Sequence, residues 1–304
     1  MTFKRRRLTR DQLLKFIPID LQRVIIQFLT LKEWNSLYRI NKQYSRYIQD
    51  RKLNFFPTKI AYYAQNKEEL KHLVNRRIYE LDLTYYRGED LNYLYGIPIK
   101  IIDLACYTAS LEALCGMSIQ RIDLGAYEGS LEPLRGMPIQ SIRLNSYDGN
   151  LEPLRGMPIQ TIYLCSYRKS LEPLRGMSIQ TIYLNFFTGN LEPLRGMPIQ
   201  TIHLPSYRGN LEPLRGMPIQ AICLSSYKGS LEPLCDLEPL RGMPIQTISL
   251  NFYSGSLEPL RGMPIRTIDL TSYTGSLEPL RGMSIQNLHF RSYSGSLEAW
   301  FKQE

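Results

Sequence analysis

The sequence contains few of the residues and motifs on which enzyme chemistry depends. Only three histidines occur in 304 residues, His72, His203 and His289. It has no Walker loop, G-x-G-x-x-G fingerprint, H-E-x-x-H pair or nucleophile elbow. His203 and His289 occupy equivalent places in two copies of an internal repeat, about 20 Å apart at ~4.8 Å per strand, so they cannot share a metal ion or a proton. We therefore expect no catalytic residue, no metal and no cofactor, and a protein that is not an enzyme.

Cysteine is also scarce, and the chain has no long apolar run. The five cysteines are Cys106, Cys115, Cys165, Cys223 and Cys235. Their odd number and irregular spacing indicate neither a disulfide framework nor a C-x-x-C metal site, so a reduced intracellular compartment is the simpler expectation. No stretch approaches 18 apolar residues, and the basic residues 4–7 are not followed by an apolar segment. We expect no membrane span, no signal peptide, and a cytoplasmic or nuclear protein.

The charge is unevenly distributed along the chain. Residues 1–77 contain 18 Lys and Arg against 6 Asp and Glu, whereas the remainder contains 19 against 22. The run from Lys4 to Arg7 is typical of a nuclear-import patch, a nucleic-acid contact or a solvated terminus. Because the rest of the chain lacks the positive charge that phosphate binding requires, nucleic acid is the less favoured partner.

One unit of 20 residues recurs through most of the chain. It has the pattern Leu-Glu-Pro-Leu-Arg-Gly-Met-Pro-Ile-Gln-x-Ile-x-Leu-x-x-Tyr-x-Gly-Ser/Asn, and it starts at Leu131, Leu151, Leu171, Leu191 and Leu211 without a gap. Further copies start at Leu91, Leu111, Leu237, Leu257 and Leu277. A fixed short period predicts a solenoid, in which each unit buries its apolar side against its neighbours.

Within each unit, the stretch Ile139 to Leu144 and its equivalents match the opening L-x-x-L-x-L of the leucine-rich repeat. A weaker version appears first at residues 78–83, so eleven short parallel strands are expected. The segment Leu-Glu-Pro-Leu-Arg-Gly is too short and too rich in Pro and Gly for a full helix, which predicts 3₁₀ or irregular turns on the convex side. The expected fold is an α/β repeat solenoid of the leucine-rich type.

Two further positions of the unit are nearly constant. The ninth position of the leucine-rich pattern is aromatic in every copy: Tyr107, Tyr127, Tyr147, Tyr167, Phe187, Tyr207, Tyr227, Tyr253, Tyr273 and Tyr293. We favour an internal stacked spine over a row of base-stacking groups, since the body carries little positive charge. Glu132 and Arg135 stand three residues apart in most units, and they indicate a solvated ladder of charges and not paired catalytic carboxylates.

One strand position varies, and its side chains alternate with core residues, so they face the concave surface. We refer to it as the variable slot. The candidate target-binding residues in this slot are Asp103, Asp123, Arg143, Tyr163, Tyr183, His203, Asp269 and His289. Aromatic residues and Arg are common anchors of protein interfaces, so the slot indicates a recognition surface. Neutral drift at exposed positions is the alternative.

The basic head contains apolar residues at helical spacing. Their pattern runs Ile17-Pro18-x-Asp20-Leu21-x-x-Val24-Ile25-x-x-Phe28-Leu29-x-x-x-x-Trp34-x-x-Leu37-x-x-Ile40-Asn41-Lys42-x-Tyr44. This pattern resembles an F-box; a generic three-helix cap is the alternative. The resemblance implies docking onto a Skp-type adaptor of a cullin ubiquitin ligase. By position in the resemblance, the adaptor-binding surface comprises Pro18, Leu21, Ile25, Leu29, Trp34, Leu37, Ile40 and Tyr44.

The repeat unit itself, with its proline and an aromatic followed by Gly-Asn, is similar to the FNIP variant of the leucine-rich repeat. That variant occurs beside F-boxes in slime moulds and in giant viruses that infect amoebae. The expected division of the chain is a basic tail (1–10), an F-box-like head (11–50), a linker and N-terminal cap (51–77), repeats (78–296, with a duplication at 231–236) and a C-terminal cap (297–304).

Together these features favour an adaptor that presents an unidentified protein target to a ubiquitin ligase. A repeat scaffold with no ligase connection stays open as an alternative, as does a nucleic-acid binder acting through the basic N-terminus.

Overall fold

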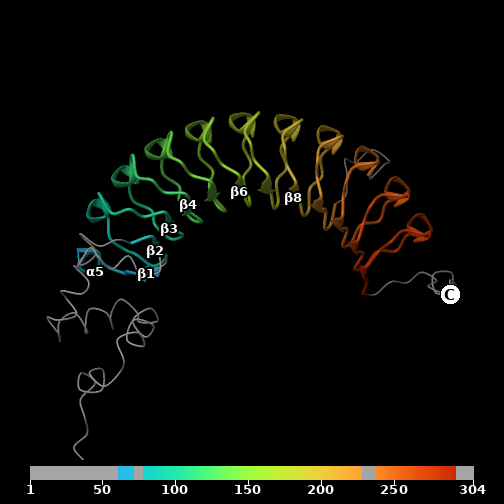
Figure 1. Cartoon of the computed structure of the whole chain (residues 1–304), viewed down its shortest axis with the longest axis horizontal. Coiled ribbons are helices and arrows are strands. Elements are labelled where there is room, and N and C mark those ends of the chain that lie inside the picture. The colour runs from blue at the N-terminus through green and yellow to red at the C-terminus, as the bar shows by residue number, and fades with distance from the viewer. Residues whose placement is uncertain (1–60, 72–77, 228–236, 292–304) are drawn as a thin grey trace, which may run out of the picture.

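The computed structural model describes residues 61–71, 78–227 and 237–291. These residues form an arc whose inner side is lined by short strands and whose outer side carries helical turns (Figure 1). The predicted basic tail, F-box-like head, duplicated segment 231–236 and C-terminal cap lie outside the described residues.

The strands form one parallel sheet of 12 strands in chain order. Their bounds are β1 Ala61–Tyr63, β2 Glu80–Asp82, β3 Ile101–Asp103, β4 Arg121–Asp123, β5 Ser141–Arg143, β6 Thr161–Tyr163, β7 Thr181–Tyr183, β8 Thr201–His203, β9 Ala221–Cys223, β10 Thr247–Ser249, β11 Thr267–Asp269 and β12 Asn287–His289. Strands β2 to β12 are the eleven that the repeat pattern predicts. Strand β1 was not predicted; it lies in the segment expected to be linker and cap, and it pairs in parallel with β2.

The helical elements are short. Helix α5 (Lys67–Lys71) follows β1; the side-chain oxygen of Asn66 accepts the Glu69 N–H at 3.0 Å, and Leu70 is buried. The convex turns are 3₁₀ helices, as predicted: η1 Asn92–Leu94, η2 Glu112–Leu114, η3 Glu132–Leu134, η4 Glu152–Leu154, η5 Glu172–Leu174, η6 Glu192–Leu194, η7 Glu212–Leu214, η8 Glu238–Leu240, η9 Glu258–Leu260 and η10 Glu278–Leu280.

The unit starting at Leu211 shows why this sequence turns as it does. Asn210 Oδ1 accepts the backbone N–H of Glu212 at 2.7 Å, which explains the Ser or Asn that precedes most repeats. The Leu214 N–H then donates to the Leu211 carbonyl at 2.8 Å, an i to i+3 bond of a 3₁₀ helix. Gly216 ends the turn at a φ of +70°, a left-handed conformation that a side chain disfavours.

Backbone hydrogen bonds extend the strand pairing beyond three residues. The Gln200 carbonyl accepts N–H groups from both Gln220, at 2.8 Å, and Ala221, at 3.0 Å. At the other end of the strand, the Leu204 N–H donates to the Cys223 carbonyl at 2.8 Å. The same contacts recur along the array, so each repeat is tied to its neighbours by the backbone.

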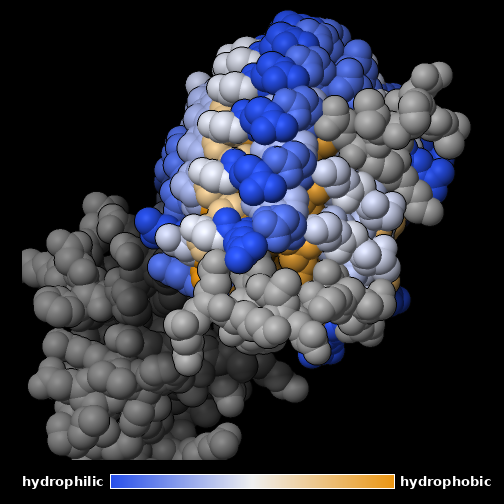
Figure 2. Space-filling view, turned by 90° about the vertical axis from the view of Figure 1, so that its right-hand side faces the viewer, coloured by the Kyte–Doolittle hydropathy of each residue, from blue (hydrophilic) through white to orange (hydrophobic). Residues whose placement is uncertain are grey.

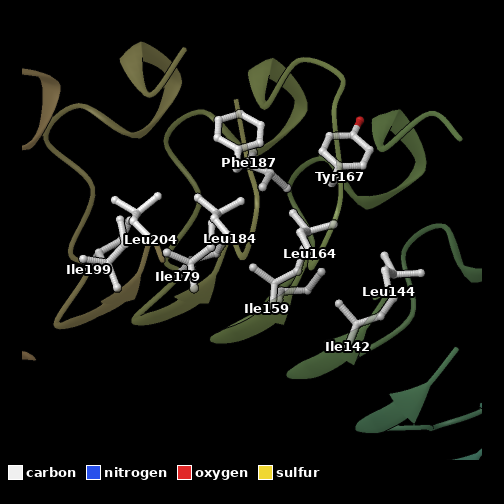
Figure 3. Close-up of a cluster of buried hydrophobic side chains, with 14 of the residues drawn as sticks. Ile142, Leu144, Ile159, Leu164, Tyr167, Ile179, Leu184, Phe187, Ile199 and Leu204 are labelled. Atoms are coloured by element: carbon white, nitrogen blue, oxygen red, sulfur yellow. The ribbon is translucent and has the colours of Figure 1, made fainter. Parts of the chain in front are cut away.

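The core is continuous along the arc. Leucine and isoleucine side chains from the strands stack on those of the next repeat, and the rings of Tyr167 and Phe187 lie between them and the convex turns (Figure 3). In the described part of the chain, no charged or polar residue is buried. The predicted aromatic spine is confirmed: Tyr207 is 1% exposed, and its ring centroid lies 6.5 Å from that of Phe187 and 6.4 Å from that of Tyr227.

The Tyr-x-Gly spacing of the unit has a steric cause. Tyr207 folds back over the chain, and its hydroxyl donates to the Gly189 carbonyl of the preceding repeat at 3.2 Å. A Cβ on Gly209 would lie 2.2 Å from the Tyr207 hydroxyl oxygen. The glycine therefore leaves room for the tyrosine ring.

The curvature follows from unequal spacing across the repeat. Strands are held about 4.8 Å apart by their hydrogen bonds. The spine rings, which lie farther toward the convex side, are spaced at 6.2 to 6.5 Å where they stack. Because the bulkier side is wider for each repeat, the array bends with its strands on the inside.

Candidate functional site on the concave face

The concave face is built from two side-chain columns. In β5 to β9 the central residue of each strand is buried and the two flanking residues are partly or fully exposed. The first column is mainly threonine: Ser141, Thr161, Thr181, Thr201, Ala221, Thr247 and Thr267. The second column is the variable slot. Its residues flank the buried central residue of each strand, on the inner side of the arc, and they differ from repeat to repeat.

The acidic end of the slot has a structural role that the sequence did not reveal. Asp103 and Asp123 are cross-strand neighbours on β3 and β4. One carboxylate oxygen of each accepts a turn N–H two residues on, from Ala105 at 2.9 Å and from Gly125 at 3.0 Å. Burial, reinforced by the charge of Asp103, raises the pKa of Asp123 even though Arg143 opposes the shift. These carboxylates hold the loop after the strand, as well as facing the concave surface.

The centre of the slot is a continuous stack. The Arg143 guanidinium donates to Asp123 Oδ2 at 2.9 Å, and its carbon lies 4.8 Å from the centroid of the Tyr163 ring. The Tyr163 and Tyr183 rings are 4.3 Å apart with an interplanar angle of 9°. The Tyr183 and His203 rings follow at 4.2 Å and 17°. We call Arg143, Tyr163, Tyr183 and His203 the central row.

The central row is held by strand register, by ring stacking and by an ion pair at its N-terminal end. Its members come from consecutive strands, β5 to β8, that are paired in register. Offset or parallel stacking of aromatic rings adds about 0.5–1.5 kcal/mol per pair beyond simple burial. The Arg143 cation over Tyr163 and its ion pair with Asp123 anchor the N-terminal end of the row. The row is thus a preorganised group of side chains and not a set of independent flexible ones.

Two predicted target-binding residues lie apart from the central row. Asp269, on β11, accepts hydrogen bonds from the Thr271 N–H at 3.1 Å and the Thr271 hydroxyl at 2.8 Å. His289 lies on the last strand, β12. Cys223 and Ser249 occupy the slot between them and the row. The structure therefore brings six of the eight predicted residues together, Asp103 to His203, and leaves Asp269 and His289 at the far end.

Sequence reasoning overlooked two exposed aromatic residues beside the concave face. Phe186 and Phe252 are each 62% exposed and have a φ of +60°. They follow the strand by three residues, where Ser166, Ser206 and other repeats carry serine in the same left-handed conformation. A left-handed backbone is unfavourable for a bulky residue, so these two aromatics are costly as well as exposed. The signal available in the sequence was that they replace serine in otherwise near-identical units.

The backbone at this position changes its partner part-way along the array. The Ser146 N–H donates to the Gly125 carbonyl of the preceding repeat at 2.9 Å. From Ser166 onward the equivalent N–H donates forward, to the Asn185 carbonyl at 2.8 Å in that first case. The left-handed residues begin at Ser166, so the reversal of the hydrogen bond and the change of φ occur together. The reversal coincides with β6, the strand that supplies Tyr163 to the central row.

The convex side carries the predicted ladder of charges. Glu132 and Arg135 form a bidentate pair at 2.8 Å, and the same pair recurs in each unit with this motif up to Glu258 and Arg261, with Glu278 and Arg281 at 3.6 Å. Figure 2 shows the array from the side of its last repeats, where strongly hydrophilic residues form a row that passes from repeat to repeat. Each partner of the first pair is more than half exposed, so the pairs contribute to solvation more than to stability.

The adaptor-binding residues of the F-box-like head lie outside the described residues. Over residues 61–71, 78–227 and 237–291, no three His, Cys, Asp or Glu side chains are grouped so that they could hold a metal ion. In the same ranges no helix is long and apolar enough to cross a membrane.

Comparison with known proteins shows the fold. No family model matches the sequence, and no curated protein sequence matches it. Among solved structures, the chain is similar to an internalin (inlF) from Listeria monocytogenes, with a TM-score of 0.58 and 13% identity over 82% of this chain and 80% of that one. An internalin C2 (inlC2) from the same organism matches with 16% identity and a TM-score of 0.33, over 75% of this chain and 76% of that one. The leucine-rich-repeat fold predicted from the sequence is confirmed by the first similarity.

Proposed function

We propose that the concave face binds a protein target through the central row, and that the F-box-like head presents this target to a ubiquitin ligase. The observation that carries the first part is the stack itself. The rings of Tyr163, Tyr183 and His203 are held side by side at 4.2 to 4.3 Å, and the Arg143 guanidinium carbon lies 4.8 Å from the Tyr163 ring centroid. Preorganised tyrosine and arginine side chains lose little entropy on binding and are frequent interface anchors.

The second part of the proposal rests on the resemblance of residues 17–44 to an F-box. It implies that Pro18 and Leu21 contact a Skp-type adaptor, which bridges to a cullin. A chain that couples such a head to an array of repeats would bind the adaptor and the target at separate places. The cell compartment that fits this function is the cytoplasm or the nucleus.

The two parts are tested with different variants of the full chain. Substitution of both Pro18 and Leu21 by alanine is expected to abolish capture of a purified Skp-type adaptor and to leave target binding intact. Substitution of both Tyr163 and Tyr183 by serine is expected to abolish target binding and to leave capture of the adaptor intact. Serine already occupies this slot at Ser249, so the fold accepts it. Asp269→Ser is the matched control, since it changes the same slot outside the row.

Target binding is measured by crosslinking in cells followed by mass spectrometry, in which proteins captured by each variant are compared. A target of the central row is retained by the Asp269→Ser variant and lost from the double tyrosine variant. Equal capture by both variants would contradict the role of the row. If no Skp-type adaptor binds the unmodified chain while a target of the row is still captured, the protein is a repeat scaffold without a ligase connection.

A further inference from the structure

Phe186 and Phe252 are exposed to solvent and are held in an unfavourable backbone conformation. Each has a φ of +60° and is 62% exposed, whereas the other left-handed side chains at this position are serines. A left-handed backbone is disfavoured for a bulky residue, and an exposed ring recovers little of that cost by packing. Strain that is kept without a packing gain is typical of binding sites. The two phenylalanines are therefore candidates for contact with a partner.

Phe186 lies at the edge of the concave face, next to the central row. It follows Tyr183 of the row by three residues, in the turn after β7. Its backbone N–H donates to the Pro205 carbonyl of the next repeat at 3.4 Å, so the turn is tied to the array although the ring is exposed. The following residue, Phe187, is buried in the spine, and Thr188 after it is exposed. The side chains on either side of the spine residue thus both face solvent.

Two exposed arginines flank Phe186 along the array. The place that Thr188 holds in its own repeat is held by Arg168 in the preceding repeat and by Arg208 in the following one. Both arginines directly follow a buried spine residue, and neither forms an ion pair within the described part of the chain. At about 4.8 Å per strand and 6.5 Å between spine rings, their backbones lie roughly 10 to 13 Å apart, with the repeat of Phe186 between them.

The charge at this place changes sign where the left-handed side chains begin. The two preceding repeats carry Glu128 and Asp148 there, and the first left-handed side chain of the described residues is Ser166. Asp148 is already paired, because Lys169 Nζ lies 3.9 Å from its Oδ1. The unpaired charge beside Phe186 is therefore positive. A ligand that contacts both this ring and the arginines is expected to carry negative charge.

We propose that Phe186, Arg168 and Arg208 form a docking surface for an acidic protein segment that carries a large apolar side chain. The apolar side chain packs on the Phe186 ring and removes it from water. Carboxylates on either side of that side chain pair with the two arginines, each through parallel hydrogen bonds that fix the direction of the segment. A protein segment is favoured over nucleic acid, because residues 78–304 contain 19 Lys and Arg against 22 Asp and Glu. The surface goes beyond the proposed function, since it needs neither the central row nor the F-box-like head.

Phe252 provides a matched comparison within the same chain. It has the same φ and the same exposed fraction as Phe186. At the place of the arginines, its own repeat carries Ser254 and the next repeat carries Thr274, so neither supplies a cation. The preceding repeat carries Lys228, which lies outside the described residues. Phe252 therefore shares the exposure and the conformation of Phe186 without its pair of arginines.

The test measures the fluorescence anisotropy of a labelled peptide with the full chain and its variants. The peptide carries a Leu-Phe pair between two pairs of Asp, and a control peptide has Asn in place of each Asp. The acidic peptide is expected to bind more tightly than the control. Phe186→Ser should weaken its binding at least about tenfold, and Phe252→Ser should change it less than about twofold. Since serine occupies this position at Ser206, neither variant is expected to lower the urea midpoint.

The arginines are tested together by Arg168→Thr with Arg208→Thr, since threonine holds the same place at Thr188. Affinity for the acidic peptide is expected to fall at least about tenfold, and to depend less on salt than that of the unmodified chain. The basic residues within 1–77 also attract an acidic peptide. Equal affinity of all variants would assign the binding to those residues and overturn the proposal. Absence of binding, or tighter binding of a single-stranded oligothymidine of equal length, would overturn it as well.

Discussion

The aromatic spine makes a quantitative prediction about stability, centred on Tyr207. This residue is 1% exposed and packs between the rings of Phe187 and Tyr227. Truncation of a buried aromatic residue to alanine costs about 3–5 kcal/mol, because it removes apolar contacts and leaves a cavity. We expect Tyr207→Ala to lower the free energy of unfolding by that amount.

Tyr207→Phe separates the ring from its hydroxyl. The hydroxyl donates to the Gly189 carbonyl at 3.2 Å, and loss of one such hydrogen bond costs about 0.5–1.5 kcal/mol. Phe187 already occupies the equivalent place in the preceding repeat and is fully buried, so a ring without a hydroxyl is compatible with the column. The difference between the two variants, about 2–4 kcal/mol, is the contribution that we assign to the ring.

The assay is urea denaturation followed by far-UV circular dichroism, with Arg208→Ala as the control. Arg208 is the next residue and is exposed, so its substitution should change stability by less than about 0.5 kcal/mol. Since repeat arrays can open locally, hydrogen exchange of peptides from residues 199–214 should show the loss, and peptides from residues 121–134 should not. If Tyr207→Ala is no more destabilising than Tyr207→Phe, the spine does not stabilise the array.

Three further predictions concern backbone, charge and pH. Gly216→Ala should cost about 1–2 kcal/mol in a urea titration because of its left-handed φ of +70°, although a Cβ there meets no atom. Gly209→Ala should cost more, because its Cβ would lie 2.2 Å from the hydroxyl oxygen of the buried Tyr207 ring. Asp123→Asn should not lower the free energy of unfolding at pH 7, because the raised pKa of Asp123 means that folding disfavours its charged form. Any gain in stability from the substitution should disappear below the usual carboxyl pKa, where Asp123 is neutral in both the folded and the unfolded chain. A clear loss of stability at pH 7 would show that the ion pair with Arg143 outweighs the cost of burial. Burial raises the pKa of Tyr207 to about 12. Its contribution to stability is therefore complete below pH 10 and falls by about 1.4 kcal/mol per pH unit between pH 10 and 12. In urea titrations over that range, the free energy of unfolding should fall less steeply with pH for Tyr207→Phe than for the unmodified protein.

The repeat made much of the fold predictable from sequence. The period of the unit defined the strands β2 to β12, and the Pro and Gly of each convex turn indicated 3₁₀ helices. Strand β1 could not be found in the same way, because Ala61–Tyr63 has no repeat motif and forms only by pairing with β2. This strand depends on the edge of the sheet that β2 offers, and the local sequence does not encode that pairing.

The site was predictable in its position but not in its contacts. Alternation along a strand places the variable slot on the concave face, which a period of two residues suffices to predict. That Arg143 would pair with Asp123 and lie over Tyr163 depends on the register between strands, and this register follows only from stacking of the repeats. The contact between the hydroxyl oxygens of Ser225 and Ser249, which are 24 positions apart, depends on the same register.

The near identity of the repeats explains why the variable slot can hold many different polar and aromatic side chains. The core residues, the spine and the turn glycines are shared by successive units and are constrained by their neighbours on both sides. A change in the variable slot touches the same slot of the adjacent strands, as Tyr183 touches Tyr163 and His203, and the turn after its own strand, as Asp103 does. Substitution there can alter the concave surface without loosening the array, and because the slot is continuous, each new side chain is placed at once against two others. A stack of four residues can therefore arise from single changes in units that are otherwise copies.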